Sequence, residues 1–185
     1  MPENSLASEV NARSVTRVGA GETARAERIV HSLDGIGQAV EPERLHRLTA
    51  ALWNAAQGLV PDTQPTELLG LDAGGILPTV GVSNASGLPF RVAWKLDLEL
   101  EPQIRFSEPH ARRTDVFVYG NVRNARILIV DDEVTTGSTL VNLVSALRSH
   151  GADVYGVAVL VEDRDGRARA ALAKRGVPLC SLATI

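Results

Sequence analysis

Residues 127–139 read ILIVDDEVTTGST, and this stretch indicates both a fold and a kind of ligand. Residues 127–130 are apolar and mostly β-branched, which predicts a buried strand of the kind found in parallel sheets. Two carboxylates, Asp131 and Asp132, follow at the carboxyl end of this strand. A loop rich in hydroxyl groups, 135–139, then leads directly into a predicted helix. This order suits a ligand that carries both a phosphate and a polyhydroxylated ring.

Composition limits the possible partners. The chain has 185 residues, of which 44% are hydrophobic, enough for one α/β domain and too few for two well-buried ones. Its net charge is −3, so it lacks the overall basic field that binding to nucleic acid or an anionic membrane requires. Aromatic residues make up 4%, which disfavours a stacking platform for single strands. We therefore expect neither nucleic acid nor a membrane as a partner.

The sequence also favours a cytoplasmic protein. No stretch approaches the roughly 20 apolar residues that span a bilayer, and the N-terminal residues lack the apolar region of a secretory signal. Cys180 is the single cysteine, so there is no disulfide framework and no cysteine cluster for a metal. Its apolar surroundings predict a buried, unreactive thiol.

Apolar spacing predicts an alternation of strands and helices, and hence one α/β domain with a central, mostly parallel sheet flanked by helices. The predicted strands are 67–71, 88–94, 127–130, 154–161 and 178–182. The predicted helices are 42–59, 76–84, 140–147 and 168–175.

Two segments do not fit this alternation. Residues 1–27 are polar and without clear periodicity, which predicts a loosely ordered N-terminal extension. Residues 96–119 contain Pro102 and Pro109 around a charged middle. A segment of that length inside a compact domain is either a functional loop or an unrecognised hairpin, and the sequence leaves both open.

Polar side chains follow four of the predicted strands: Asp72, Lys95, Asp131 and Glu162. In a parallel sheet the carboxyl ends of the strands share one edge, and ligands bind outside that edge. We therefore expect these residues to surround one site.

The loop 135–139 offers successive backbone N–H groups, hydroxyl groups and a helix N-terminus with about half a positive charge. Gly137 allows the backbone to turn tightly against an anion. The acidic pair repels such an anion, so Asp131 and Asp132 are better suited to accept hydrogen bonds from ribose hydroxyls or to hold magnesium through water.

The chain lacks a Walker A loop and a Rossmann glycine pattern. Residues 127–133 are also similar to the first strand of a response-regulator receiver, but too few strand–helix units follow for that fold. A pair of solvated aspartates that cap the helix is the remaining structural interpretation.

The run 127–139 resembles the signature with which type I phosphoribosyltransferases bind 5-phosphoribosyl 1-diphosphate (PRPP). Other segments follow in the order of that family. Residues 70–76 resemble its pyrophosphate loop, and 89–95 resemble the next strand, whose terminal lysine also reaches pyrophosphate. Residues 96–117 occupy the place of its flexible loop, and 162–164 resemble an acidic-Asp-Arg turn of the orotate branch, the nearest in pattern.

The resemblance implies a magnesium-dependent enzyme that transfers the 5-phosphoribosyl group from PRPP to a nitrogen of a nucleobase or a related heterocycle, with release of pyrophosphate. It also implies the family fold over residues 28–185, with a core of 43–185 and a small hood. The hood would come from about 28–42 and the chain ends. Members of the family are commonly homodimers, so we expect a homodimer.

The resemblance also implies roles for individual residues. The 5-phosphate would bind to Thr135, Thr136, Gly137, Ser138 and Thr139, and the ribose and Mg²⁺ (through water) to the catalytic pair Asp131 and Asp132. Pyrophosphate would bind to Asp72, Ala73, Gly74 and Lys95. The flexible loop would contribute Arg105, His110, Arg112 and Arg113, and Arg164 would lie near the base.

Two questions stay open. Arg164 is equally compatible with an ion pair to Glu162 or Asp165, and the lysine and Ser-Pro-x-Tyr elements of orotate enzymes are missing, so the sequence does not identify the acceptor. A regulator that binds PRPP without turnover is the alternative function.

Overall fold

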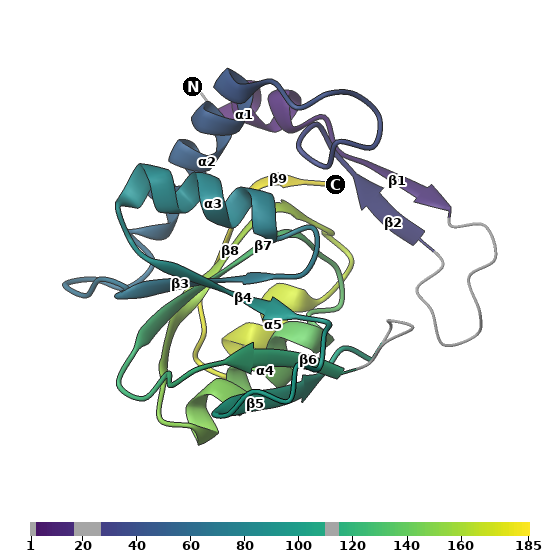
Figure 1. The fold of residues 1–185 in the computed structure, drawn as a ribbon. Coiled ribbons are helices and arrows are strands. Elements are labelled where there is room, and N and C mark those ends of the chain that lie inside the picture. The colour runs from purple at the N-terminus through teal and green to yellow at the C-terminus, as the bar shows by residue number, and fades with distance from the viewer. Residues whose placement is uncertain (1–2, 17–26, 110–114) are drawn as a thin grey trace.

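The computed structural model describes residues 3–16, 27–109 and 115–185 (Figure 1). Its centre is a seven-stranded sheet with the order β5-β6-β4-β3-β7-β8-β9. These strands are β3 (Glu67–Leu71), β4 (Phe90–Trp94), β5 (Gln103–Ser107), β6 (Asp115–Tyr119), β7 (Arg126–Val134), β8 (Asp153–Glu162) and β9 (Leu179–Thr184). The helices are α1 (Glu3–Val10), α2 (Pro42–Ala56), α3 (Ile76–Ser86), α4 (Ser138–Ser149) and α5 (Ala168–Ala173), and a separate hairpin joins β1 (Arg13–Thr16) to β2 (Glu27–Val30).

The sheet is mostly parallel, as predicted. Strand β3 pairs in parallel with β4 and β7, β7 with β8, and β8 with β9. Strand β6 runs in the opposite direction to the other six strands of this sheet and pairs antiparallel with β4 and β5. The carboxyl ends of β3, β4 and β7 therefore meet at one edge, which places the segments after them close together.

The apolar residues of β7 divide between two cores. Leu128 and Val130 pack with α1, α2 and α3, whereas Ile127 and Ile129 pack with α4 and α5 on the opposite face (Figure 1). This alternation explains the unbroken apolar run, because a central parallel strand is covered on both faces. None of the helices in the described residues is long and apolar enough to cross a lipid bilayer.

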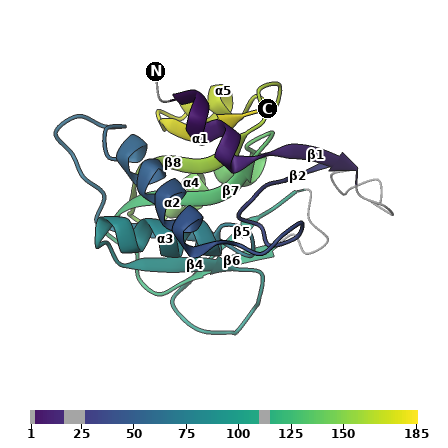
Figure 2. The same ribbon diagram turned by 90° about the horizontal axis from the view of Figure 1, so that it is seen from above.

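The prediction of a loosely ordered extension is wrong for residues 3–16. Val10 of α1 is fully buried, and Leu6 and Ala7 pack against the same cluster as α2. Strand β1 then pairs antiparallel with β2, and together they extend beside the helical layer (Figure 2). One helical turn of apolar residues within a polar segment is too short to show a period. Residues 17–26 lie outside the described part of the chain.

The segment 96–119 contains a hairpin, one of the two interpretations left open. Strands β5 and β6 pair antiparallel, and Ile104 and Phe106 point into the core while Arg105 between them is exposed. The sequence obscured this alternation because the apolar positions are few and charged residues and prolines surround them.

The boundaries of two other elements differ from the prediction. Strand β7 continues through the acidic residues to Val134, because Asp131, Glu133 and Val134 remain paired with β8. The acidic pair therefore lies within a strand rather than after it. Helix α2 ends at Ala56, although its apolar spacing continues to Leu59.

A close approach between α2 and α3 gives a stability prediction. A Cβ at Gly81 would lie 2.5 Å from Oγ1 of the buried Thr49. We expect Gly81→Ala to destabilise the protein by about 1–3 kcal/mol in urea unfolding, because overpacking outweighs the better helix propensity of alanine. A Cβ at Gly58 meets nothing within 4 Å, so Gly58→Ala is the matched control. Equal stability of the two variants would contradict the packing.

Candidate functional site

The ends of β3 and β4 are joined by Asp72. Its backbone N–H donates to the carbonyl of Ala93 at 3.0 Å, and its carboxylate accepts the N–H of Lys95 at 3.2 Å. Residues Asp72 to Gly75 then turn into α3, with a cis peptide between Asp72 and Ala73. Two of the predicted anion-binding elements are therefore fixed to each other.

The acidic pair of β7 lies directly against this turn. A Cβ at Gly74 would lie 2.1 Å from Asp132 Oδ2, and a Cβ at Gly75 would lie 2.7 Å from Asp131 Oδ1. No side chain fits between the carboxylates and the turn, so glycine is required for this approach. The structure thus brings together the two segments that the sequence placed at one site.

Asp132 is buried, with 5% of its surface exposed. Its Oδ2 faces two cationic or polar side chains, Arg28 Nη2 at 3.4 Å and His31 Nε2 at 3.5 Å. Burial by itself would raise the pKa of Asp132. The interactions with His31, Asp131 and Arg28 outweigh burial, so the pKa lies below its usual value and Asp132 stays ionised.

The pKa of Asp131 is shifted in the opposite direction to that of Asp132. Burial, followed by the negative charge of Asp132, raises the pKa of Asp131 well above its usual value. The N–H of Asp132 donates to Asp131 Oδ1 at 3.0 Å, which opposes this shift without cancelling it. Two carboxylates this close resist full ionisation until a cation or a hydroxyl-bearing ligand reaches them.

The loop after β7 forms the start of α4. Gly137 has φ 73°, and a Cβ there would lie 2.9 Å from Cα of Ala168, so both backbone and packing favour glycine. Thr136 Oγ1 lies 3.1 Å from Ser138 Oγ. The first N–H groups of a helix have no partner within the helix, and its dipole favours an anion there. Thr135 to Thr139 therefore have the backbone arrangement of an anion site.

Lys95 reaches from the end of β4 to the β5–β6 hairpin. Its Nζ lies 2.8 Å from Oε2 of Glu108, and the two side chains are 32% and 25% exposed. Glu108 directly follows the last residue of β5. The lysine predicted to bind pyrophosphate therefore forms an ion pair with a carboxylate of this chain.

The predicted flexible-loop residues have two outcomes. The prediction that Arg105 belongs to a loop is wrong: it lies in β5, and its Nη2 bonds Asp115 Oδ2 of β6 at 2.6 Å. Because side chains alternate between the two faces of a strand, the side chain of Arg105 points away from the core. His110, Arg112 and Arg113 lie outside the described residues.

The structure of the turn after β8 rules out the ion pair between Arg164 and Glu162. The buried carboxylate of Glu162 accepts hydrogen bonds from Arg169 and from Ser181, the latter at 3.0 Å. Arg164 is exposed, and its backbone N–H donates to the carbonyl of Ile185 at 2.9 Å. Glu162 is therefore the partner of Arg169 rather than of Arg164.

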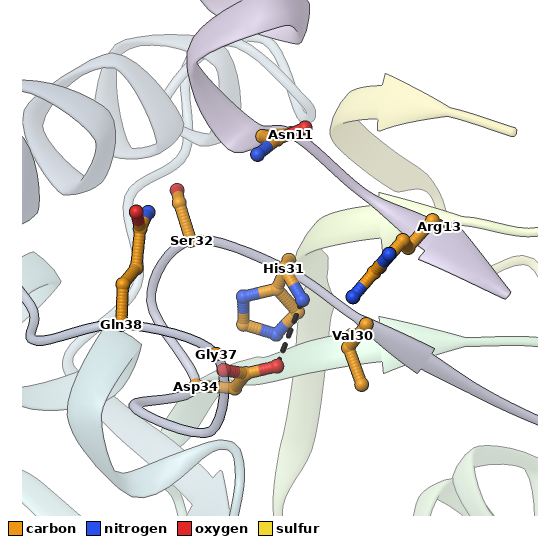
Figure 3. Close-up of a pocket in the computed structure, with 8 residues that line it drawn as sticks. All are labelled: Asn11, Arg13, Val30, His31, Ser32, Asp34, Gly37 and Gln38. Carbon is orange, nitrogen blue, oxygen red and sulfur yellow. Dashed lines mark hydrogen bonds between the residues drawn. The ribbon is translucent and has the colours of Figure 1, made fainter. Parts of the chain in front are cut away.

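Sequence reasoning missed the contribution of β2. Besides the Arg28 and His31 contacts, the N–H of Ile29 donates to Glu133 Oε2 at 2.8 Å. Beside this strand lies a cavity of about 210 Å³ (Figure 3). It is lined by Asn11, Arg13, Val30, His31, Ser32, Asp34, Gly37 and Gln38. A four-residue strand next to an irregular loop gives no periodic signal, so only the tertiary structure reveals these contacts.

Neither a thiol nor a protein-only metal site is part of this arrangement. Within the described residues, no group of three or more His, Cys, Asp or Glu side chains could hold a metal ion. Cys180 is half-buried rather than buried as predicted, and burial raises the pKa of its thiol to about 12, so the thiol stays protonated.

Comparison with known proteins gives a family match and close relatives. A family model described as "Phosphoribosyl transferase" matches residues 88–181. An adenine phosphoribosyltransferase of Streptomyces coelicolor is 34% identical over 141 residues, 74% of this chain and 78% of that protein. A hypoxanthine/guanine phosphoribosyltransferase of Methanohalobium evestigatum is 31% identical over 155 residues, 82% of this chain and 76% of that protein.

Solved structures agree with the fold. An adenine phosphoribosyltransferase of Leishmania tarentolae superposes with a TM-score of 0.76 at 21% identity, covering 100% of this chain and 89% of that one. An orotate phosphoribosyltransferase of Mycobacterium tuberculosis gives a TM-score of 0.58 at 21% identity, covering 98% of this chain and 95% of that one. The type I fold that the signature implied is thereby confirmed.

The raised pKa of Asp131 predicts a stabilising substitution. An acid whose folded pKa is raised costs stability at pH values above that pKa, and the cost disappears as pH falls toward its unfolded value of about 4. We expect Asp131→Asn to raise the Tm by a few degrees at pH 7.5, about 1 kcal/mol, and to lose this advantage near pH 4. Scanning calorimetry at both pH values measures it.

The exposed Asp153, with 68% of its side chain accessible, supplies the control. Asp153→Asn should leave the Tm within about 1 °C at either pH, since surface substitutions have small effects. A Tm of Asp131→Asn below that of the wild type at pH 7.5 would show that the carboxylate is not electrostatically costly.

Proposed function

Because this chain belongs to the phosphoribosyltransferase family, we propose that it transfers the 5-phosphoribosyl group from PRPP to a nitrogen of a nucleobase or a related heterocycle and releases pyrophosphate. The contact between the acidic pair and the Asp72–Gly75 turn carries the proposal. It joins a site suited to hydroxyl groups with a site suited to an anion, and the α4 N-terminus adds a second anion site. A sugar with phosphate at one end and diphosphate at the other requires all three.

Each part of the donor has a suitable partner. The N–H groups and hydroxyls of Thr135 to Thr139 would bind the 5-phosphate. Asp131 and Asp132 would accept hydrogen bonds from the ribose hydroxyls. The backbone of the Asp72–Gly74 turn and the Lys95 ammonium would bind pyrophosphate, once Lys95 leaves Glu108.

The proposed reaction breaks the bond from ribose C1 to the pyrophosphate oxygen and forms a bond from C1 to the acceptor nitrogen, which loses a proton. The transition state carries positive charge on the ribose ring, and the carboxylates of Asp131 and Asp132 are placed to stabilise it. Closure of a loop over the site would exclude water, which competes with the acceptor as nucleophile.

Magnesium fits this proposal as an ion that arrives with the substrate. Mg²⁺ is usually held by one or two carboxylates together with phosphate oxygens and water. Asp131 and Asp132 supply such carboxylates, and their mutual repulsion is relieved by a cation. Bound there, the ion would neutralise charge on the departing pyrophosphate.

The acceptor would bind between β2 with its following loop and the ribose site. The cavity beside His31 has amide, guanidinium, imidazole and carboxylate groups but no phenylalanine, tyrosine or tryptophan among its lining residues. We therefore propose recognition by hydrogen bonds rather than by stacking, with Arg164 near the base. The curated relatives named above act on purines, which makes purines the first acceptors to test.

The proposal includes a homodimer in the cytoplasm. The homodimer follows from the family resemblance, and the location is supported by the absence of a disulfide framework in a chain with one cysteine. Sedimentation equilibrium on the purified chain tests the assembly.

A screen of nucleobases with PRPP and Mg²⁺ tests the function. We expect pyrophosphate release and a product with the mass of a nucleotide when the correct base is present. Asp131→Asn/Asp132→Asn should lower kcat by at least about 100-fold with a folded protein, because the charge that stabilises the transition state is gone. Tight PRPP binding without product for any base would favour the regulator instead.

Lys95→Ala tests the pyrophosphate side. A hydrogen bond from a charged donor contributes about 1.5–3 kcal/mol, so its loss should lower kcat/KM for PRPP about 10–100-fold. Lys174, exposed at the end of α5, gives the matched control, and Lys174→Ala should match the wild type. Similar kinetics for the two alanine variants would remove Lys95 from the site.

A further inference from the structure

Three segments of the fold meet at one oxygen atom, Oδ2 of Asp132. The β3–α3 turn reaches it through Gly74, whose Cβ position would lie 2.1 Å away. The segment that follows β2 reaches it through His31 Nε2 at 3.5 Å, and β2 itself through Arg28 Nη2 at 3.4 Å. A carboxylate on a central strand thus contacts both the donor side and the β2 side of the site.

The orientation of His31 is fixed by its other ring nitrogen. Nδ1 accepts the N–H of Leu33 at 3.2 Å, so Nδ1 carries no proton. In the neutral ring the proton is therefore on Nε2, the nitrogen that faces Asp132. The His31 side chain is 1% exposed, and Nε2 makes no hydrogen bond of ordinary geometry within the described residues. A buried donor without a partner is unfavourable, and Asp132 Oδ2 is the acceptor in front of it.

The backbone beside His31 is also held. The Ile29 N–H bonds Glu133 Oε2 at 2.8 Å, and the His31 N–H bonds Asp34 Oδ2 at 2.8 Å (Figure 3). The first bond fixes β2 to β7, and the second stabilises the turn that follows β2. The imidazole is therefore presented from a rigid support, which is what a residue that orients another side chain needs.

We propose that His31 is a positioning residue for PRPP: its Nε2–H holds Asp132 Oδ2 between the β2 segment and Gly74, so that the donor site is complete only when that segment is docked. The inference rests on the proposed function, since it assigns Asp132 to the ribose of PRPP. Arg28 is less suited to this task, because its side chain is 38% exposed and longer, with more conformations to lose.

Two conservative substitutions separate positioning from local structure. In His31→Gln the amide NH₂ stands near the place of Nε2 and can donate to Asp132. In His31→Asn the shorter amide stands near Nδ1, so it can accept from Leu33 but does not reach Asp132. The exposed His46 provides the control His46→Gln.

Calorimetric titration of the full chain with PRPP and Mg²⁺ measures the effect. We expect His31→Gln and His46→Gln to bind PRPP within about 3-fold of the wild type. We expect His31→Asn to bind it about 10–100-fold more weakly, by analogy with the loss seen when the outer partner of a metal ligand is removed. The opposite order, with Asn retaining affinity and Gln losing it, would assign His31 to the Leu33 turn and overturn the proposal.

A double-mutant cycle with Asp132→Asn tests whether the effect passes through Asp132. In that background, His31→Asn should change PRPP affinity by less than about 2-fold, because the partner it orients is already altered. An undiminished 10–100-fold loss would mean that His31 acts elsewhere.

Thermal unfolding without ligand distinguishes a folding defect. If His31→Asn lowers the Tm but its folded fraction binds PRPP as tightly as the wild type, His31 is structural and the proposal fails. Failure of the proposed function looks different, because wild-type protein itself would then show no PRPP binding.

Discussion

The site depends on the close contact between two carboxylates of a central strand and a turn made of glycine. A Cβ atom on Gly75 would clash with the carboxylate of Asp131, and a Cβ atom on Gly74 would clash with the carboxylate of Asp132. This contact fixes the distance between the ends of β3 and β7, and through the Asp72–Lys95 hydrogen bond it also fixes the end of β4. It also places negative charge in a buried position, which lowers the stability of the folded state. The raised pKa of Asp131 reflects this loss of stability.

The sequence predicted the parts of the molecule whose signals are local or periodic. Three segments predict both an element and a kind of ligand: the apolar run 127–130, the glycines after Leu71 and the hydroxyl-rich loop before α4. The strand order places their ends together, as expected for a parallel sheet. Every predicted strand and helix appears in the structure, with shifts mainly at the ends of the elements.

What the sequence did not reveal depends on contacts between distant residues. Helix α1 shows one apolar turn, and its order comes from packing against α2 and β9. Arg105 seemed to belong to a loop because its alternating neighbours are few. Arg28 and His31 gave no signal at all, since their partner Asp132 lies about 100 residues away in the chain.

The separate attachment of the β1–β2 segment has an evolutionary consequence. The proposed donor site consists of carboxylates of β7 and of the segments that follow β3 and β7, whereas the cavity beside His31 is lined by residues outside the seven-stranded sheet. Except at His31, which contacts Asp132, substitutions in that lining would alter the surface proposed for the acceptor without disturbing the packing of the seven-stranded sheet. A fold arranged in this way allows acceptor preference to diversify among descendants while the chemistry of the donor stays unchanged.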